Sequence, residues 1–90
     1  MKTQGHIYYS GMVQGVGFRY TVVRFTKGRP LTGWVRNLPD GRVEVLVEGE
    51  RSEIEALMQD IEDRFSLYIK DKKVSFAPAE SRFQDFRIAG

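Results

Sequence analysis

Residues 38 to 48 constrain the fold of this chain more than any other segment. Residues 38–41 form a turn sequence, because Pro39 fixes φ at the first corner and Gly41 supplies a positive φ at the end. From Arg42 to Glu48 the residues then alternate without a break, with three valines on one face and mainly charged side chains on the other. A turn followed by strict alternation predicts a hairpin in an antiparallel sheet, with one buried face and one face in solvent.

The clearest helical pattern lies between Ser52 and Phe65. Ser52 and Glu55 have the spacing of a capping box, which indicates where the helix begins. Five apolar residues share one face of this helix: Ile54, Leu57, Met58, Ile61 and Phe65. One helix buries about this much apolar surface on a sheet, so we interpret the stripe as core-facing.

Further segments predict additional strands. His6 to Met12 and Leu31 to Asn37 are rich in β-forming residues and predict one strand each. After a polar connection at residues 70–73, Val74 to Ala77 predicts a short strand, and Phe83 to Ile88 predicts the last one.

The segment after Gly17 is ambiguous by pattern alone. Phe18, Val22 and Phe25 recur at helical spacing, but the β-branched residues among them are weak helix formers. With a helix here, the order becomes β-α-β-β-α-β. Two helices that share one apolar face of an antiparallel sheet make the ferredoxin-like α+β sandwich the natural arrangement. We expect a single domain over residues 1–90.

Composition excludes several classes of protein. The chain has no cysteine, which excludes disulfides, a thiol nucleophile and thiolate metal sites. Its single histidine, His6, and its scattered carboxylates show no ligand spacing, so we expect no metal and no cofactor. The formal charge is only +2, with acids and bases interleaved, which does not indicate nucleic acid. No segment approaches the roughly 20 apolar residues that span a bilayer, and we expect a soluble cytoplasmic monomer with no membrane partner.

A glycine-rich loop separates the first predicted strand from the segment at Phe18. Three glycines fall within residues 11–17, and Gly15 and Gly17 leave room for a tetrahedral anion beside the main chain. Such a loop at the start of a helix exposes N–H groups where the helix dipole is positive, and Arg19 adds a planar fork that matches two phosphate oxygens. The combination predicts a phosphate site. The alternative interpretation is that the glycines only form a tight turn and that the Arg19 side chain lies in solvent. The loop lacks the glycine motifs of P-loop and dinucleotide-binding folds, so nucleotide binding has little support.

Three segments together resemble a known family. Gly11 to Arg19, followed by Gly33 to Asn37 and Asp40 to Glu44, is similar to the signature motifs of the acylphosphatase family. The resemblance is detailed from about Ile7 to Gly49, and the predicted fold agrees with that family's ferredoxin-like domain. The family pattern is not followed at Lys27 to Pro30 and at Asp71 to Ala79. These departures affect the scaffold and the rim of the substrate site, so they bear on stability and on acyl-group preference rather than on the reaction.

The resemblance implies a reaction and assigns roles to residues. It implies hydrolysis of the carboxyl–phosphate anhydride bond of a small acyl phosphate, with Arg19 as the catalytic, phosphate-binding arginine and Asn37 orienting the attacking water. The backbone amides expected to complete the phosphate cradle belong to Gln14, Gly15, Val16, Gly17 and Phe18. The leaving carboxylate has a parent acid with a pKa of about 4, so no general acid is required and His6 is expected to be structural.

Two rival functions share the predicted fold. An RNA-binding sheet needs aromatic residues for base stacking on its third strand, and Arg42 to Glu48 has none. A regulatory module that binds a small metabolite is the more serious alternative, because a phosphate cradle can bind without hydrolysis. Domains similar to acylphosphatases also occur inside larger maturation enzymes. Because anion binding alone has no evident need for Asn37, a 90-residue chain that carries both Arg19 and Asn37 favours the enzyme.

Overall fold

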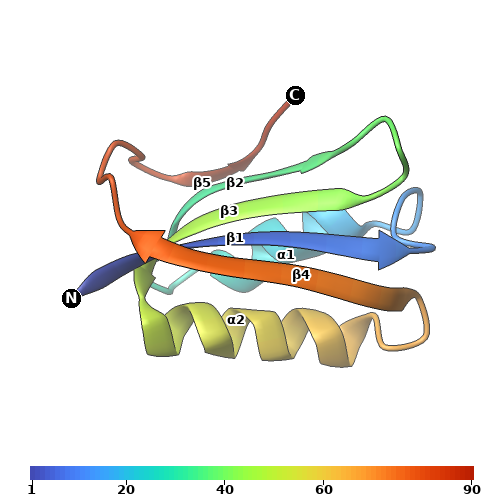
Figure 1. The fold of residues 1–90 in the computed structure, drawn as a ribbon, viewed down its shortest axis with the longest axis horizontal. Helices are drawn as coiled ribbons and strands as arrows, with labels where there is room; N and C mark the ends of the chain where they lie inside the picture. The colour runs from blue at the N-terminus through green and yellow to red at the C-terminus, as the bar shows by residue number, and fades with distance from the viewer.

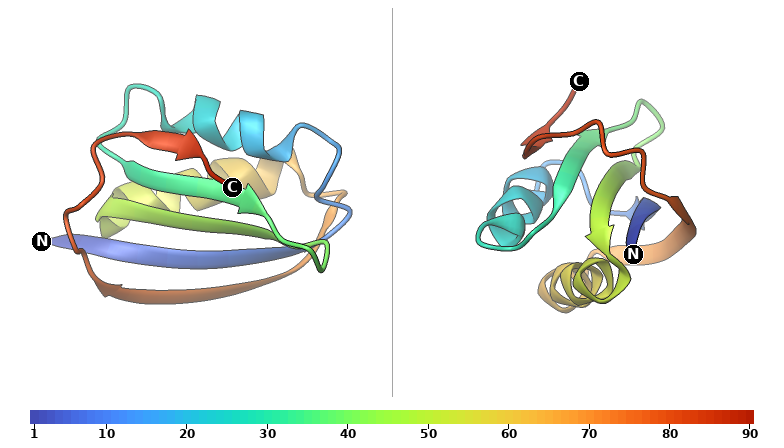
Figure 2. Two further views of the ribbon diagram at one scale, coloured as in Figure 1. Left: turned by 90° about the horizontal axis from the view of Figure 1, so that it is seen from above. Right: turned by 90° about the vertical axis from the view of Figure 1, so that its left-hand side faces the viewer.

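The computed structural model describes residues 1–90 as one sheet with two helices packed on a single face (Figures 1 and 2). The elements follow in the order β1 (Lys2–Gly11), α1 (Phe18–Thr26), β2 (Thr32–Asn37), β3 (Val43–Glu50), α2 (Arg51–Arg64), β4 (Ile69–Pro78) and β5 (Phe86–Ile88). The strand order across the sheet is β4-β1-β3-β2-β5. The predicted ferredoxin-like α+β fold is confirmed.

The sheet differs from the prediction in one respect, because it is mixed rather than antiparallel. β1 pairs antiparallel with β3 and β4, and β2 pairs antiparallel with β3. β5 instead lies parallel to β2, with Val35 opposite Ile88. The chain leaves β4 at one edge of the sheet and crosses the strand ends to reach the other edge, so it enters β5 in the direction of β2 (Figure 1).

The core lies between the sheet and the helices. The ambiguous segment is helical, and α1 buries Phe18 and Val22 there despite its β-branched residues, since packing outweighs weak intrinsic preference. The predicted apolar face of the second helix is also buried. The predicted capping box is wrong: α2 begins at Arg51 with Glu50 as its N-cap, and no side chain caps it. Ser52 already lies inside the helix, because α2 follows β3 without a loop.

The polar connection predicted at residues 70–73 is also wrong, because these residues belong to β4. Their backbone pairs with β1, where Tyr8 lies opposite Lys73 and Ser10 opposite Asp71. β4 is an edge strand, and charged side chains are common on such edges because they discourage pairing with other chains. The charged side chains of residues 70–73 thus indicated a loop, whereas backbone hydrogen bonds with β1 make this segment a strand.

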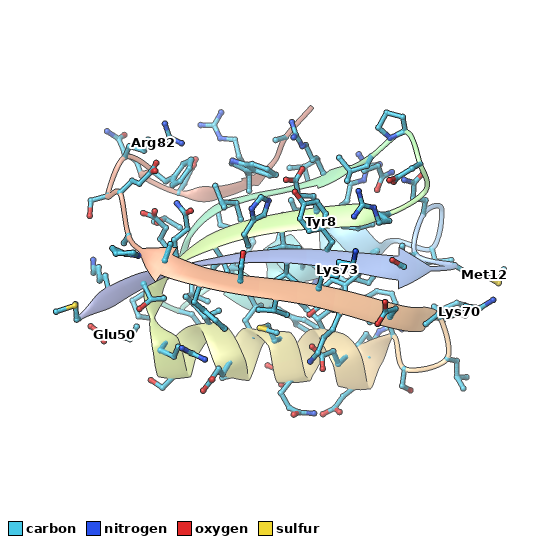
Figure 3. The ribbon with its side chains drawn as sticks, in the orientation of Figure 1. Tyr8, Met12, Glu50, Lys70, Lys73 and Arg82 are labelled. Carbon is cyan, nitrogen blue, oxygen red and sulfur yellow. The ribbon has the colours of Figure 1, made fainter.

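β3 is buried on both faces, which corrects the prediction of a half-buried strand. Besides its valines, Glu44, Leu46 and Glu48 expose only 4%, 7% and 3% of their surface. On the sheet face away from the helices, hydrogen bonds with His6 and Arg36 hold Glu44, and Leu46 lies between β1 and β2, opposite His6 and Trp34. Figure 3 shows Tyr8 and Lys73 in front of the sheet on this face. The connection from β4 to β5 covers Glu48. The backbone N–H groups of Glu80 and Ser81 donate to its carboxylate at 2.8 and 3.0 Å.

The hydrogen bonds of Glu48 predict a loss of stability in acid. Burial tends to raise the pKa of this carboxyl, but hydrogen bonds from the Glu80 backbone, the Gln4 side chain and the Ser81 backbone outweigh it and leave the pKa below its ordinary value. A pKa that is lower in the folded state stabilises the fold above the unfolded value of about 4.3, and this stabilisation is lost as the pH falls through the folded pKa. We expect Glu48→Gln to lose about 1–3 kcal/mol at neutral pH and to depend less on pH between 2 and 5.

Urea unfolding measured at several pH values checks this expectation. The exposed Glu55 on α2 provides the matched control, and Glu55→Gln should follow the parent at every pH. An acid dependence as steep in Glu48→Gln as in the parent would show that Glu48 is not the group responsible.

Candidate active site

The loop between β1 and α1 exposes bare backbone at the start of a helix. Gly17 caps α1 with φ 78°, and Gly15 has φ 79°, so both lie in the left-handed region that favours glycine. No heavy atom lies within 4 Å of the position that a Cβ would take at either residue. The space beside both glycines is therefore open.

The N–H groups of this segment have no partner within the protein. From Val13 to Tyr20 no backbone N–H donates a hydrogen bond to another backbone group. The first turn of α1 holds no acidic side chain, and no side chain caps the helix. Unused N–H groups at the positive end of a helix dipole form a ready site for an anion.

A pocket of about 130 Å³ opens at this point and contains residues of both sequence motifs. It is lined by Val13, Gly15, Gly17, Phe18, Arg19, Tyr20, Asn37 and Ile88. Of the loop residues predicted to bind phosphate, Gly15, Gly17, Phe18 and Arg19 line the pocket, whereas Gln14 and Val16 do not. Val16 packs against the core. The structure thus places residues 19 and 37 at one cavity.

Arg19 is the only charged residue of the pocket. Its guanidinium, on the first turn of α1, forms no ion pair with a carboxylate, and no acidic residue lines the cavity. The donors of the guanidinium and the helix dipole therefore act together on whatever occupies the pocket, and both favour negative charge.

Asn37 is the last residue of β2, on the sheet face that carries the helices. It lies opposite Val43, next to the pair of Val35 and Val45 whose side chains are in the core. Its Oδ1 is buried and has no hydrogen-bond partner. A buried acceptor without a partner destabilises a fold by about 1–3 kcal/mol, so its presence at the pocket calls for an explanation.

His6 lies outside the pocket, on the other face of the sheet. Its Nε2 is 2.5 Å from Oε2 of Glu44, whose other oxygen accepts a hydrogen bond from Arg36 Nε at 2.7 Å. Burial tends to raise the pKa of Glu44, but hydrogen bonds from His6, Arg36 and Tyr8 outweigh it and leave the pKa below its ordinary value. No group of three or more histidine, aspartate or glutamate side chains is arranged to hold a metal ion. The contact of His6 is thus with the Glu44 carboxylate, on the sheet face away from the helices and from the pocket.

Sequence reasoning did not find three further pocket residues, Val13, Tyr20 and Ile88. Tyr20 and Ile88 are large apolar side chains that remain 66% and 43% exposed beside the cavity. Ile88 comes from the far end of the chain and reaches the pocket only because β5 pairs with β2. Tyr20 directly follows Arg19, which is the one signal in the sequence that could have identified it.

A larger cavity of about 390 Å³ lies at the opposite end of the sheet, beside the connection from β4 to β5. Its Glu48 already accepts three hydrogen bonds, and its Arg29 is paired with Asp60 through Nη2, while the buried Nη1 of Arg29 has no hydrogen-bond partner. Neither Arg19 nor Asn37 reaches it, so it does not compete as the candidate site.

Neither helix has the length or the apolar character to cross a membrane.

The two-layer fold and the pocket at the start of α1 define a ferredoxin-like domain with a small site at its helix N-terminus, in which Arg19 is the one charged residue. The family model described as acylphosphatase matches residues 5–88. An acylphosphatase from Chlorobaculum tepidum is 42% identical over 86 residues, which cover 92% of this chain and 91% of that protein. The chain belongs to the acylphosphatase family.

Other matches differ in how much of each protein they span. The acylphosphatase from Trichormus variabilis is 54% identical over 54 residues, and the match spans only 54% of that protein's length. The crystal structure of acylphosphatase from Bacillus subtilis superposes with a TM-score of 0.89 at 36% identity, covering 98% of this chain and 99% of that one. Full-length HypF in its phosphate- and nucleotide-bound form matches with a TM-score of 0.86 at 31% identity, covering 100% of this chain but 12% of HypF.

Proposed function

We propose that this protein hydrolyses small acyl phosphates at the carboxyl–phosphate anhydride bond, releasing a carboxylate and inorganic phosphate. The observation that carries the proposal is the shared pocket, in which Arg19, Asn37 and a loop of unused N–H groups converge. Membership in the acylphosphatase family supports it independently.

In this proposal Arg19 and the loop bind the phosphate. The guanidinium donates to two phosphate oxygens, and further donors come from the backbone N–H groups of Gln14, Gly15, Val16, Gly17 and Phe18. Charge on the transferring phosphoryl group spreads over its equatorial oxygens, so fixed donors around it stabilise the transition state. They also hold the phosphorus still, which removes part of the entropic barrier to attack by water.

Asn37 orients the attacking water. Its Oδ1, which has no partner in the structure, accepts a hydrogen bond from a water placed opposite the scissile P–O bond. Attack forms a new P–O bond, the anhydride P–O bond breaks, and its electron pair leaves with the carboxylate. The proton lost by the water goes to the phosphate product or to solvent. A neutral carboxamide directs the water without repelling the anionic substrate, whereas a carboxylate in its place would repel it.

Release of phosphate from benzoyl phosphate in the presence of a chelator tests the proposal. We expect hydrolysis that continues with EDTA present, because the leaving carboxylate needs neither protonation nor a metal. Complete absence of hydrolysis by the folded protein contradicts the proposal.

The second candidate is a domain that binds a phosphorylated metabolite without cleaving it. The match to one part of HypF favours it, because the domain there is part of a much longer chain. Titration with inorganic phosphate alongside the hydrolysis assay separates the two functions. Phosphate binding without turnover would support the binding domain, whereas turnover supports the enzyme.

Tyr20 and Ile88 predict which part of the substrate contacts the rim. The pocket is small, so a bound phosphate fills most of it and the acyl group extends over these two exposed side chains. Loss of the Tyr20 ring removes apolar contact with an aromatic acyl group. We expect Tyr20→Ala to raise KM for benzoyl phosphate about 5-fold to 10-fold, and to change KM for acetyl phosphate less than 2-fold.

Steady-state kinetics on both substrates check this expectation. Leu67 is 93% exposed and lies outside the pocket, so Leu67→Ala is the matched loss of a surface apolar side chain and should leave both KM values unchanged. An equal rise in KM for both substrates in Tyr20→Ala would place Tyr20 at the phosphate rather than at the acyl group.

A further inference from the structure

The side chain of Gln14 connects the two segments that carry the site. Its Nε2 donates to the backbone oxygen of Leu38 at 2.8 Å and to that of Arg42 at 3.0 Å. Gln14 directly precedes Gly15 of the loop, and Leu38 directly follows Asn37. Loop and hairpin lie side by side at one end of the molecule, near the labelled Met12 (Figures 1 and 3).

The two acceptors are the carbonyls that close the hairpin turn. Leu38 N–H donates to Arg42 O at 2.8 Å, and Gly41 N–H donates to Leu38 O at 3.1 Å. Within the turn, Asp40 accepts a hydrogen bond from the Arg42 backbone at 3.0 Å. The turn is thus closed by its own hydrogen bonds, and Gln14 uses the remaining acceptor capacity of both closing carbonyls. A rigid turn held at two points transmits the position of the loop directly to the end of β2.

No other hydrogen bond joins residues 13–17 to residues 37–42. The Gln14 side chain is exposed and contributes nothing to the core, so its stabilising effect on the whole fold is small. Its effect on geometry is specific, because the loop N–H groups and the Asn37 carboxamide sit on two segments that only this amide connects by hydrogen bonds.

We propose that Gln14 is a positioning residue for hydrolysis, which fixes the Asn37 carboxamide relative to the phosphate cradle. This role rests on the proposed function. It differs from the contribution of the Gln14 backbone N–H to the cradle, since the side chain points to the hairpin and acts on the reaction only through Asn37.

Gln14→Met tests the role, because methionine has a similar length and no charge but cannot donate. We expect kcat for benzoyl phosphate to fall about 10-fold, because the two neutral hydrogen bonds from Gln14 no longer hold the geometry. KM and the inhibition constant of inorganic phosphate should change less than 2-fold, because Arg19 and the loop remain. The midpoint of urea unfolding should stay at the parent value.

Two comparisons separate positioning from a general structural effect. Gln59 on α2 donates its side-chain amide to Asp63 at an exposed site, so Gln59→Met removes a comparable bond and should leave kcat unchanged. In an Asn37→Ala background, Gln14→Met should lower kcat no further, because a residue that acts through Asn37 has nothing left to position.

The outcomes distinguish this proposal from the proposed function. A hydrolysing parent whose kcat is unchanged by Gln14→Met overturns the role of Gln14 alone. The same 10-fold loss in both backgrounds also overturns it, because Gln14 would then act independently of Asn37. A parent that binds phosphate but hydrolyses nothing overturns the proposed function, and the role of Gln14 with it.

Discussion

Arg19→Gln is expected to lower kcat/KM for benzoyl phosphate by about 10³-fold or more. Arginines that stabilise a phosphoryl transition state typically contribute 10³-fold to 10⁵-fold, and here no second charged side chain lines the pocket to compensate. Glutamine keeps a donor but loses both the positive charge and the fork that matches two oxygens. Affinity for inorganic phosphate should fall in parallel, because the same contacts hold the product.

Arg24 provides the control for the loss of one positive charge. It lies on the same helix, is exposed, and forms no ion pair. Arg24→Gln changes the net charge of the protein equally, so it should hydrolyse benzoyl phosphate at the parent rate. If Arg19→Gln matched the parent in kcat/KM and in phosphate affinity, the anion in the pocket would be held by the loop alone and the role assigned to Arg19 would be wrong.

The parts of the fold that the sequence predicts are those with a local signature. The turn at Pro39 and the apolar face from Ile54 to Phe65 depend on neighbouring residues, and both are present in the structure. The strand at residues 70–73 depends on backbone pairing with β1, which leaves no trace in side chains that point into solvent. The parallel fifth strand depends on the connection from β4 to β5, which donates backbone hydrogen bonds to the Glu48 carboxylate. The alternating pattern of β3 predicts that Glu48 is exposed, so this contact could not be predicted from the sequence.

The candidate site shows the same division. Gly15, Gly17 and Arg19 are adjacent in sequence, so their chemistry could be read as one unit before any fold was known. That Asn37 reaches the same cavity follows from the geometry of β2, and only the family resemblance anticipated it. Ile88 could not be anticipated, because its position depends on the register of β5.

Gly33 illustrates a motif residue with a structural reason. A Cβ at Gly33 would lie 1.9 Å from the backbone oxygen of Leu46, and its φ is 138°, so only glycine lets β2 approach β3 this closely. The motif from Gly33 to Asn37 thus combines a requirement of the sheet at one end with a requirement of the pocket at the other. Motif membership alone does not distinguish the two.

Asn37→Ala is expected to separate catalysis from binding and from stability. We expect kcat for benzoyl phosphate to fall about 10²-fold to 10³-fold, the usual effect of removing one preorganised polar group from a catalytic site. The inhibition constant of inorganic phosphate should change less than 2-fold, because the carboxamide acts on water rather than on the phosphate. Its buried Oδ1 has no partner, so removing it should leave the urea midpoint unchanged or raise it.

Asn37→Asp provides the contrast, since it keeps an acceptor for the water and adds negative charge beside the pocket. Phosphate affinity should then fall, because the new carboxylate opposes Arg19, and the loss should lessen as salt screens the repulsion. If Asn37→Ala weakened phosphate binding as much as it lowered kcat, the carboxamide would be a phosphate ligand. A variant that lost kcat alone and unfolded at the parent midpoint or above would show that the protein tolerates an unsatisfied buried oxygen because the reaction requires it.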